Sequence, residues 1–212
     1  MVRQVLWTFG LGVCLVLSAT AVHATVVNFD DLQPWLNLTG SGYAGLTWGT
    51  STDHAYPGQT SYWATTSEDS FPTYSEPHSY PVYVYPGYGG DNLWFSFPSP
   101  VTFNGAWFAS VPTVQLNAAH RVRLRDDLGN TSDWLELSET PQYLSASFLG
   151  TTTVFVERAD GESEPGFDGA KWYTMDDITY NESSAVPEPS SLSLLAACVA
   201  AGGVLKFRRR RK

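Results

Sequence analysis

Two pairs of adjacent aspartates lie near opposite ends of the chain and could together hold a metal ion. Asp30 and Asp31 follow the first strand-like segment, and Asp176 and Asp177 lie within the last one. If these two strands are neighbours, the four carboxylates come together, and oxygen ligands from two segments suit Ca²⁺. The alternative is that the aspartates face water or cap a turn. Calcium is therefore a hypothesis, without the Asp-x-Asp-x-Asp-Gly loop that marks an EF-hand.

Aromatic residues are the second group that could do chemistry, and they are dense between Gly49 and Asp91. Rings exposed on loops offer a large contact area at a low entropic cost, as sugar-binding surfaces require. The alternative is that Trp48 and one face of the Tyr83/Tyr85 alternation belong to the core. The candidates for ligand contact are Trp35, Trp48, Trp63, Tyr83, Tyr85 and Tyr88.

Residues that indicate catalysis are sparse. The chain has no Gly-x-Ser-x-Gly elbow, His-Glu-x-x-His helix or phosphate-binding loop. His54, His78 and His120 lack the spacing of zinc ligands. We expect a protein that is not an enzyme. Because a glycosidase needs only two suitably spaced carboxylates, a glycan hydrolase is kept as an alternative.

Short strand-like segments with turn residues between them fill the middle of the chain. The clearest is a hairpin in which Arg121–Arg125 alternates polar and apolar residues, turns at 126–130 and returns at 134–137. Spacing of about ten residues predicts an all-β fold, an antiparallel β-sandwich of jelly-roll type, over residues 25–182. The segment 49–91 is interpreted as long ordered loops. The other expected strands are 25–29, 93–97, 101–103, 105–109, 144–148, 151–157 and 172–180.

The N-terminal segment is typical of a secretory signal peptide. Arg3 precedes an apolar stretch from Val5 to about Leu17, and Val22-His23-Ala24 supplies a small-residue cleavage site. We expect export by the Sec machinery and cleavage by signal peptidase after Ala24, so that residues 1–24 are removed. An uncleaved membrane anchor is the alternative.

The C-terminal segment, residues 183–212, has the pattern of a membrane helix with a cationic end. An uncharged apolar run from about Leu192 to Leu205 is followed by a basic cluster that includes Arg208, Arg209, Arg210 and Arg211. Positive charge beside an apolar helix favours the cytoplasmic side, which places the rest of the chain outside. The alternative, a helix buried in a soluble core, leaves those charges without partners.

The order of Val186, Pro187, Glu188 and Pro189, an apolar helix and an arginine block resembles the PEP-CTERM sorting signal of Gram-negative bacteria that secrete exopolysaccharide. The resemblance implies that an exosortase-like membrane protease recognises Pro187, Glu188 and Pro189 and removes the tail. It also implies a transient stay in the inner membrane, then a place at the cell surface or in the extracellular matrix. Exopolysaccharide is the ligand to expect there, and a purely structural surface protein is the alternative.

Short blocks in residues 25–182 are similar to domains that commonly precede this sorting signal. They are Phe29-Asp30-Asp31-Leu32, Gly42-Tyr43-Ala44-Gly45-Leu46-Thr47-Trp48, Phe103-Asn104-Gly105-Ala106-Trp107-Phe108 and Met175-Asp176-Asp177-Ile178. The similarity implies a jelly roll of the carbohydrate-binding or galactose-binding kind.

The charge of the body excludes several partners. Residues 25–185 carry five basic and twenty acidic side chains, a formal net charge of −15. Such a body repels nucleic acid and anionic lipid. Both cysteines, Cys14 and Cys198, lie in the targeting segments, so the body has neither a disulfide nor thiol chemistry.

Overall fold

A computed structural model describes residues 24–53, 55, 58–67, 78–111, 118–159 and 171–181. The predicted signal peptide up to His23 and the predicted sorting tail, residues 183–212, lie outside this part. Within the described ranges, no helix is long and apolar enough to cross a membrane.

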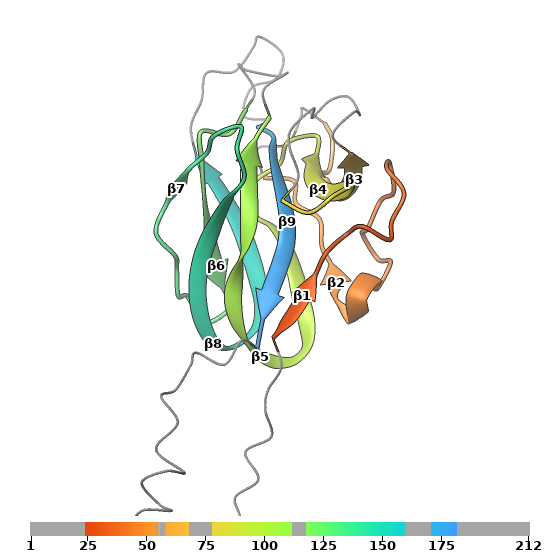
Figure 1. Ribbon diagram of the computed structural model, residues 1–212. Coiled ribbons are helices and arrows are strands. Elements are labelled where there is room, and N and C mark those ends of the chain that lie inside the picture. The colour runs from red at the N-terminus through yellow and green to blue at the C-terminus, as the bar shows by residue number, and fades with distance from the viewer. Residues whose placement is uncertain are drawn as a thin grey trace, which may run out of the picture.

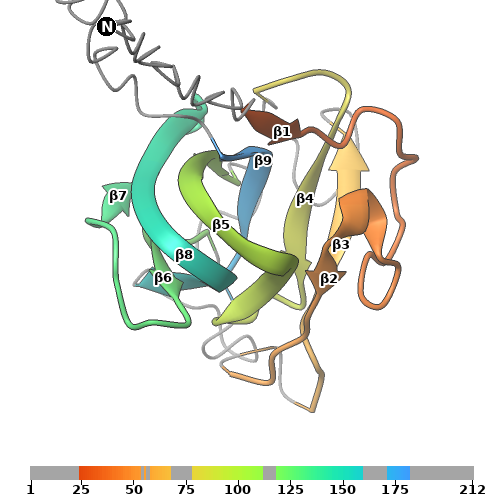
Figure 2. The same ribbon diagram turned by 90° about the horizontal axis from the view of Figure 1, so that it is seen from below.

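The described strands form one curled antiparallel sheet (Figures 1 and 2). Its main path runs β3-β4-β9-β5-β8-β6-β7, while β1 pairs with β9 and β2 with β5. The prediction of an all-β, antiparallel fold is confirmed. In the described residues, however, the core is enclosed by one curled sheet and not by two separate sheets. The strands are β1 (Thr25–Val27), β2 (Thr47–Trp48), β3 (Tyr62–Ser67), β4 (Val82–Gly87), β5 (Leu93–Ser110), β6 (Arg121–Asp126), β7 (Leu135–Glu136), β8 (Gln142–Ala159) and β9 (Tyr173–Tyr180), with one 3₁₀ turn, η1 (Tyr43–Gly45).

Two long strands, β5 and β8, produce the curl. Each has 18 residues, and their pairing register shifts between Ser96 and Val101. Pro98 and Pro100 lie in this stretch and have no backbone N–H for the ladder, so the strand bulges and bends there. The sequence predicts separate strands on either side of a proline turn, whereas the structure joins them into one bent strand.

The core inside the curl is largely aromatic. Trp48 packs edge-on against Trp63 with ring centroids 6.0 Å apart, and Trp63 packs against Tyr173 at 6.3 Å. Phe95 and Phe103 continue the cluster along β5, with centroids 5.9 Å apart. Burying such rings removes 150–250 Å² of surface each, which is a large stabilisation for a body without disulfides.

The segment from Gly49 to Asp91 differs from the predicted loops, because it contains β3 and β4. The six paired residues of the two strands run from Tyr62↔Gly87 to Ser67↔Val82. Every residue of β4 is buried. A strand covered on both faces lacks the alternation of buried and exposed residues that identifies most strands. The tyrosines and proline of β4 were therefore interpreted as part of a loop.

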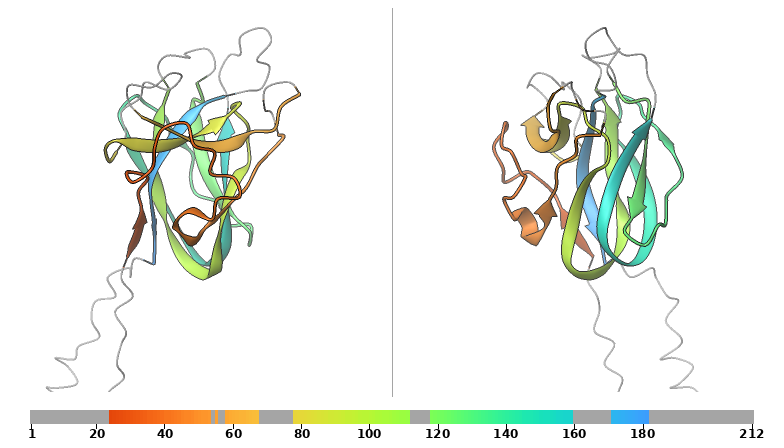
Figure 3. Two further views of the ribbon diagram at one scale, coloured as in Figure 1. Left: turned by 90° about the vertical axis from the view of Figure 1, so that its right-hand side faces the viewer. Right: turned by 180° about the vertical axis from the view of Figure 1, so that it is seen from behind.

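The hairpin predicted at 121–137 is present as β6 and β7, with Arg121 opposite Glu136. The predicted neighbourhood of the first and last strands is also confirmed, since Thr25 pairs with Tyr180 and Val27 with Ile178. The chain therefore enters β1 and leaves β9 at the same end of the molecule (Figure 3).

Candidate functional site

Three of the four predicted aspartates converge on the hydroxyl of Ser79. Its Oγ lies 3.1 Å from Asp177 Oδ1, 3.3 Å from Asp176 Oδ2 and 3.5 Å from Asp30 Oδ1. The pairing of β1 with β9 brings Asp30 to this place, as the sequence predicts. Ser79 comes from the segment before β4, which joins the cluster from the other side.

A bulge in β9 explains how two consecutive aspartates reach the same side. The register with β5 shifts between the pairs Gly105↔Thr179 and Trp107↔Asp176, which places an extra residue on β9. Asp177 has a φ of 41°, in the left-handed region. Bulges re-aim side chains in this way, so neighbouring carboxylates that would alternate across a regular strand lie together here.

Burial and mutual repulsion set the protonation of this cluster. Burial, together with the charges of Asp177 and Asp30, raises the pKa of Asp176 to about 7. Its two oxygens accept hydrogen bonds from the backbone N–H groups of Ser79 and Asp177, both at 2.8 Å, and these bonds partly oppose the rise in pKa. Burial and the charge of Asp177 also raise the pKa of Asp30.

A row of three rings borders the cluster. His78 Nδ1 lies 2.6 Å from Asp177 Oδ2, and the imidazole stacks on Trp107 with centroids 3.6 Å apart and planes 12° apart. Trp107 in turn contacts Tyr143, its register partner on β8, at 5.6 Å. All three side chains are partly exposed.

A shallow cleft lies beside two of these rings, those of His78 and Trp107, and beside Asp176. Trp107 lies in its wall, and Asp176 brings a carboxylate to it. The cleft therefore combines ring faces, a hydroxyl and a carboxylate, which is the mixture of groups that recognises sugars. Its lining residues are His78, Tyr83, Trp107, Phe108, Ala109, Pro141, Thr174 and Asp176.

The calcium hypothesis is not supported by this arrangement. Asp31 does not contact Ser79 as the other three aspartates do, and its Oδ1 accepts a hydrogen bond from the Tyr43 hydroxyl at 2.6 Å. Among the described residues, no three His, Cys, Asp or Glu side chains are placed to hold a metal ion. The oxygens of Asp176 and Asp177 are instead occupied by backbone N–H groups and by His78.

Most of the aromatic residues predicted to contact a ligand belong to the core. Trp48, Trp63, Tyr83 and Tyr85 are buried in strands β2, β3 and β4, and of these four only Tyr83 borders the cleft, from beneath the surface. This corrects the expectation of exposed loop aromatics. Tyr88, with 41% of its surface exposed, packs edge-on against Tyr62 at 5.6 Å and remains on the surface.

The sequence interpretation missed the rings that border the cleft. Trp107 could have been found, because Ala106 and Phe108 on either side of it are buried and a strand alternates its faces. No neighbouring residue in the sequence indicates a role for His78. Its place beside the cleft follows from its contacts with Trp107 and Asp177, which are distant in the sequence.

Residues 185–211 match the PEP-CTERM protein-sorting motif. No curated protein matches the chain. The motif indicates a surface protein that is exported, passes through the membrane and is processed by an exosortase-type partner.

The sorting motif gives a direct prediction. Replacing Pro187, Glu188 and Pro189 together by alanine should leave a longer, membrane-bound form of the protein, since proline disfavours helix and favours the extended backbone that a protease groove binds. Immunoblots of membrane and released fractions measure this. Replacing Ser190 and Ser191 by alanine in the same way is the control. Equal release of the triple variant and the wild type would contradict the role of the motif.

Proposed function

We propose that the body of this surface protein, residues 25–182, is a non-catalytic module of jelly-roll type that binds exopolysaccharide at the cleft beside Trp107. The observation that carries the proposal is the row of partly exposed rings of His78, Trp107 and Tyr143 beside the Asp176 carboxylate.

Each part of the cleft matches a feature of a sugar. The rings of Trp107 in the cleft and of Tyr143 beside it can pack against sugar C–H groups. The Asp176 carboxylate, whose oxygens each have a second lone pair besides the one used by a backbone N–H, can accept from sugar hydroxyls. Because Asp30, Asp176 and Asp177 gather there, a negatively charged sugar is disfavoured. The cleft thus suits the neutral, hydroxyl-rich part of a polysaccharide.

The proposed route explains how the body meets its ligand. Sec export and signal peptidase release the N-terminus at Ala24, and the tail holds the protein in the inner membrane with Arg208–Arg211 on the cytoplasmic side. The exosortase-type partner then removes the tail, and the body enters the matrix outside the cell.

Two alternatives to glycan binding stand against this proposal. In a purely structural surface protein, nothing would favour partly exposed aromatic rings such as that of Trp107 on the surface. A glycan hydrolase would use Asp176, whose pKa of about 7 suits a general acid. The non-catalytic reading is preferred because both oxygens of Asp176 accept backbone N–H groups and Asp177 is engaged by His78.

The proposal is tested by where the processed protein resides. Cells producing the wild type, Trp107→Ala or Trp107→Phe are separated into matrix and free medium, and the protein in each is quantified. We expect the alanine variant to shift to the medium and the phenylalanine variant, which keeps a ring, to be largely retained. Trp35→Ala is the matched control, because Trp35 is 57% exposed and does not line the cleft.

The same samples address the alternatives. Unchanged matrix retention of Trp107→Ala would contradict glycan binding at the cleft. Release of new reducing ends from the polysaccharide by the wild type, lost in Asp176→Asn, would establish a hydrolase instead.

A further inference from the structure

Three arginines point outward from one strand on another side of the body. Arg121, Arg123 and Arg125 on β6 alternate with the buried residues Val122, Leu124 and Asp126. Alternate residues of a strand are about 6.7 Å apart on one face, so the three side chains form a straight row. We call this row the arginine strip.

Aromatic rings hold the arginines of the strip in place. The guanidinium carbons of Arg121 and Arg123 lie 4.9 Å and 4.6 Å from the centroid of Trp134, and that of Arg125 lies 4.2 Å from the centroid of Phe155. Stacking of this kind restrains a long side chain before any ligand arrives. The entropic cost of ordering these arginines on binding is therefore small.

One carboxylate bridges two members of the strip. Glu157 on β8 is opposite Arg123 in the register and contacts Arg123 Nε at 2.6 Å and also Arg125 Nε. Both contacts with Glu157 are made by Nε, and the two Nη groups of each guanidinium carry four further N–H donors. The side chains of Arg123 and Arg125 are 33% and 32% exposed, against 14% for Glu157.

The charge around the strip differs from that of the rest of the body. Glu136 lies opposite Arg121, and Glu157 compensates one of the two charges of Arg123 and Arg125, so one positive charge of the strip is left in excess, at Arg123 and Arg125. Of the other two basic residues of the body, Lys171 is buried, and burial lowers the pKa of Arg158 beside Asp91. In a body of net charge −15, the outward-facing positive side chains of the described residues thus gather in one row.

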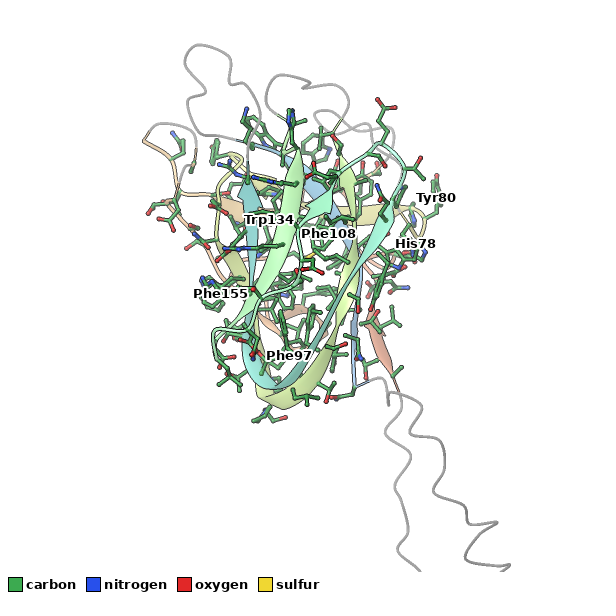
Figure 4. All side chains as sticks on the ribbon, turned by 90° about the vertical axis from the view of Figure 1, so that its left-hand side faces the viewer. His78, Tyr80, Phe97, Phe108, Trp134 and Phe155 are labelled. Atoms are coloured by element: carbon green, nitrogen blue, oxygen red, sulfur yellow. The ribbon has the colours of Figure 1, made fainter. Side chains whose placement is uncertain are left out.

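We propose that the arginine strip is a second binding site, for the anionic group of an acidic sugar: a carboxylate or a sulfate ester. A guanidinium binds either group through two parallel hydrogen bonds. Exposed ion pairs add about 0–1 kcal/mol to stability, so stabilisation alone gives little reason to align three arginines on one strand. In Figure 4 Phe155 is labelled on the left of the molecule, Trp134 near its middle and His78 on its right. Along β8, the residue opposite Arg123 is Glu157, whereas the residue opposite Trp107 is Tyr143, near the other end of the strand.

The site favours short acidic segments over long polyanions. At 0.15 M salt the Debye length is about 8 Å, so charges of the acidic body far from the strip act weakly on a ligand held there. A long polyanion instead passes over other acidic surface of the body and is repelled. Together, the strip would bind an acidic part and the cleft a neutral part of the same polysaccharide.

Titration calorimetry of the full-length chain in neutral detergent at 0.15 M NaCl tests the proposal. The probes are a trimer of galacturonate, its neutral counterpart galactotriose, and a sulfated galactotriose. We expect the wild type to bind at least one acidic trimer tenfold or more tightly than the neutral one by way of the strip. The two acidic trimers distinguish a carboxylate from a sulfate as the bound group.

Variants separate a binding role from a structural one. Arg123→Gln combined with Arg125→Gln should reduce affinity for the acidic trimer at least tenfold, and Arg123→Lys should lose part of it, because lysine keeps the charge without the planar fork. Glu157→Gln should increase affinity severalfold, since it removes the competing carboxylate. A purely structural ion pair predicts no such gain.

Specific outcomes would overturn the proposal. These are equal affinity of the wild type for acidic and neutral trimers, unchanged affinity in the double variant, or loss of affinity in a Glu157→Gln chain that melts cooperatively. Trp107→Ala should leave acidic-trimer affinity unchanged, so a failure of the strip and a failure of the cleft are told apart.

Discussion

Replacing Trp63 by alanine should lower the free energy of unfolding by about 3–5 kcal/mol, the range for removing a fully buried aromatic side chain. Trp63 has no exposed surface and packs against Trp48 and Tyr173. Its Nε1–H donates to the carbonyl oxygen of Trp94 at 3.0 Å, so the substitution leaves a cavity and also removes one of two hydrogen bonds to that oxygen, which keeps the backbone N–H of Gly49 at 2.8 Å.

Thermal unfolding measures this effect. For a body of this size, 3–5 kcal/mol corresponds to a fall in Tm of roughly 10 °C. Trp35→Ala is the control and should change Tm by little, because Trp35 is largely exposed. The comparison also tests whether Trp63 is a core residue and not a ligand contact. A Trp63→Ala chain with an unchanged Tm and weakened glycan binding would restore Trp63 as a ligand contact.

Replacing Asp176 by asparagine should change how stability depends on pH. Burial raises the pKa of Asp176 from 3.8, the ordinary value of an aspartate, to about 7 in the folded protein. The folded state therefore holds this proton more tightly than the unfolded state. That contribution to stability is present below about pH 4 and is lost as pH rises to about 7, with a total on the order of 2–4 kcal/mol.

The measurement is Tm of the wild type and of Asp176→Asn at each pH from 5 to 8. The variant does not titrate, and any cost of its amide in the hydrogen bonds to Ser79 and Asp177 is the same at every pH. We expect Tm of the variant minus Tm of the wild type to rise by several degrees across this range. Asp127 and Glu157, whose pKa values are lowered, act in both proteins and cancel in the difference. Parallel curves would show that Asp176 is not the titrating group.

The parts of the fold that could be predicted are those whose cause is local. The alternation of Arg121 to Asp126 identified β6 correctly, because one face of that strand is buried and the other is not. The neighbourhood of the first and last strands led to the meeting of Asp30 with Asp176 and Asp177, and the structure brings these three together.

The parts that could not be predicted depend on contacts distant in sequence. Tyr83 and Tyr85 resemble exposed loop aromatics in sequence, and only the burial of both faces of β4 makes them core residues. The left-handed conformation of Asp177 follows from a bulge against β5, and a bulge has no reliable sequence mark. The alternation of the three arginines with apolar residues is visible in the sequence. The stacking of their guanidinium groups on the rings of Trp134 and Phe155 is not, because it depends on the folded structure.

The most direct test of the central claim is the equilibrium affinity of the purified full-length chain for the neutral repeat oligosaccharide of the exopolysaccharide made by the producing cells. Calorimetry in neutral detergent compares the wild type, Trp107→Ala and Trp107→Phe. Truncating a central aromatic contact costs about 2 kcal/mol, so the alanine variant should bind roughly 30-fold more weakly, with most affinity kept by phenylalanine. Binding by the wild type that Trp107→Ala leaves unchanged, or no binding at all, would contradict the account.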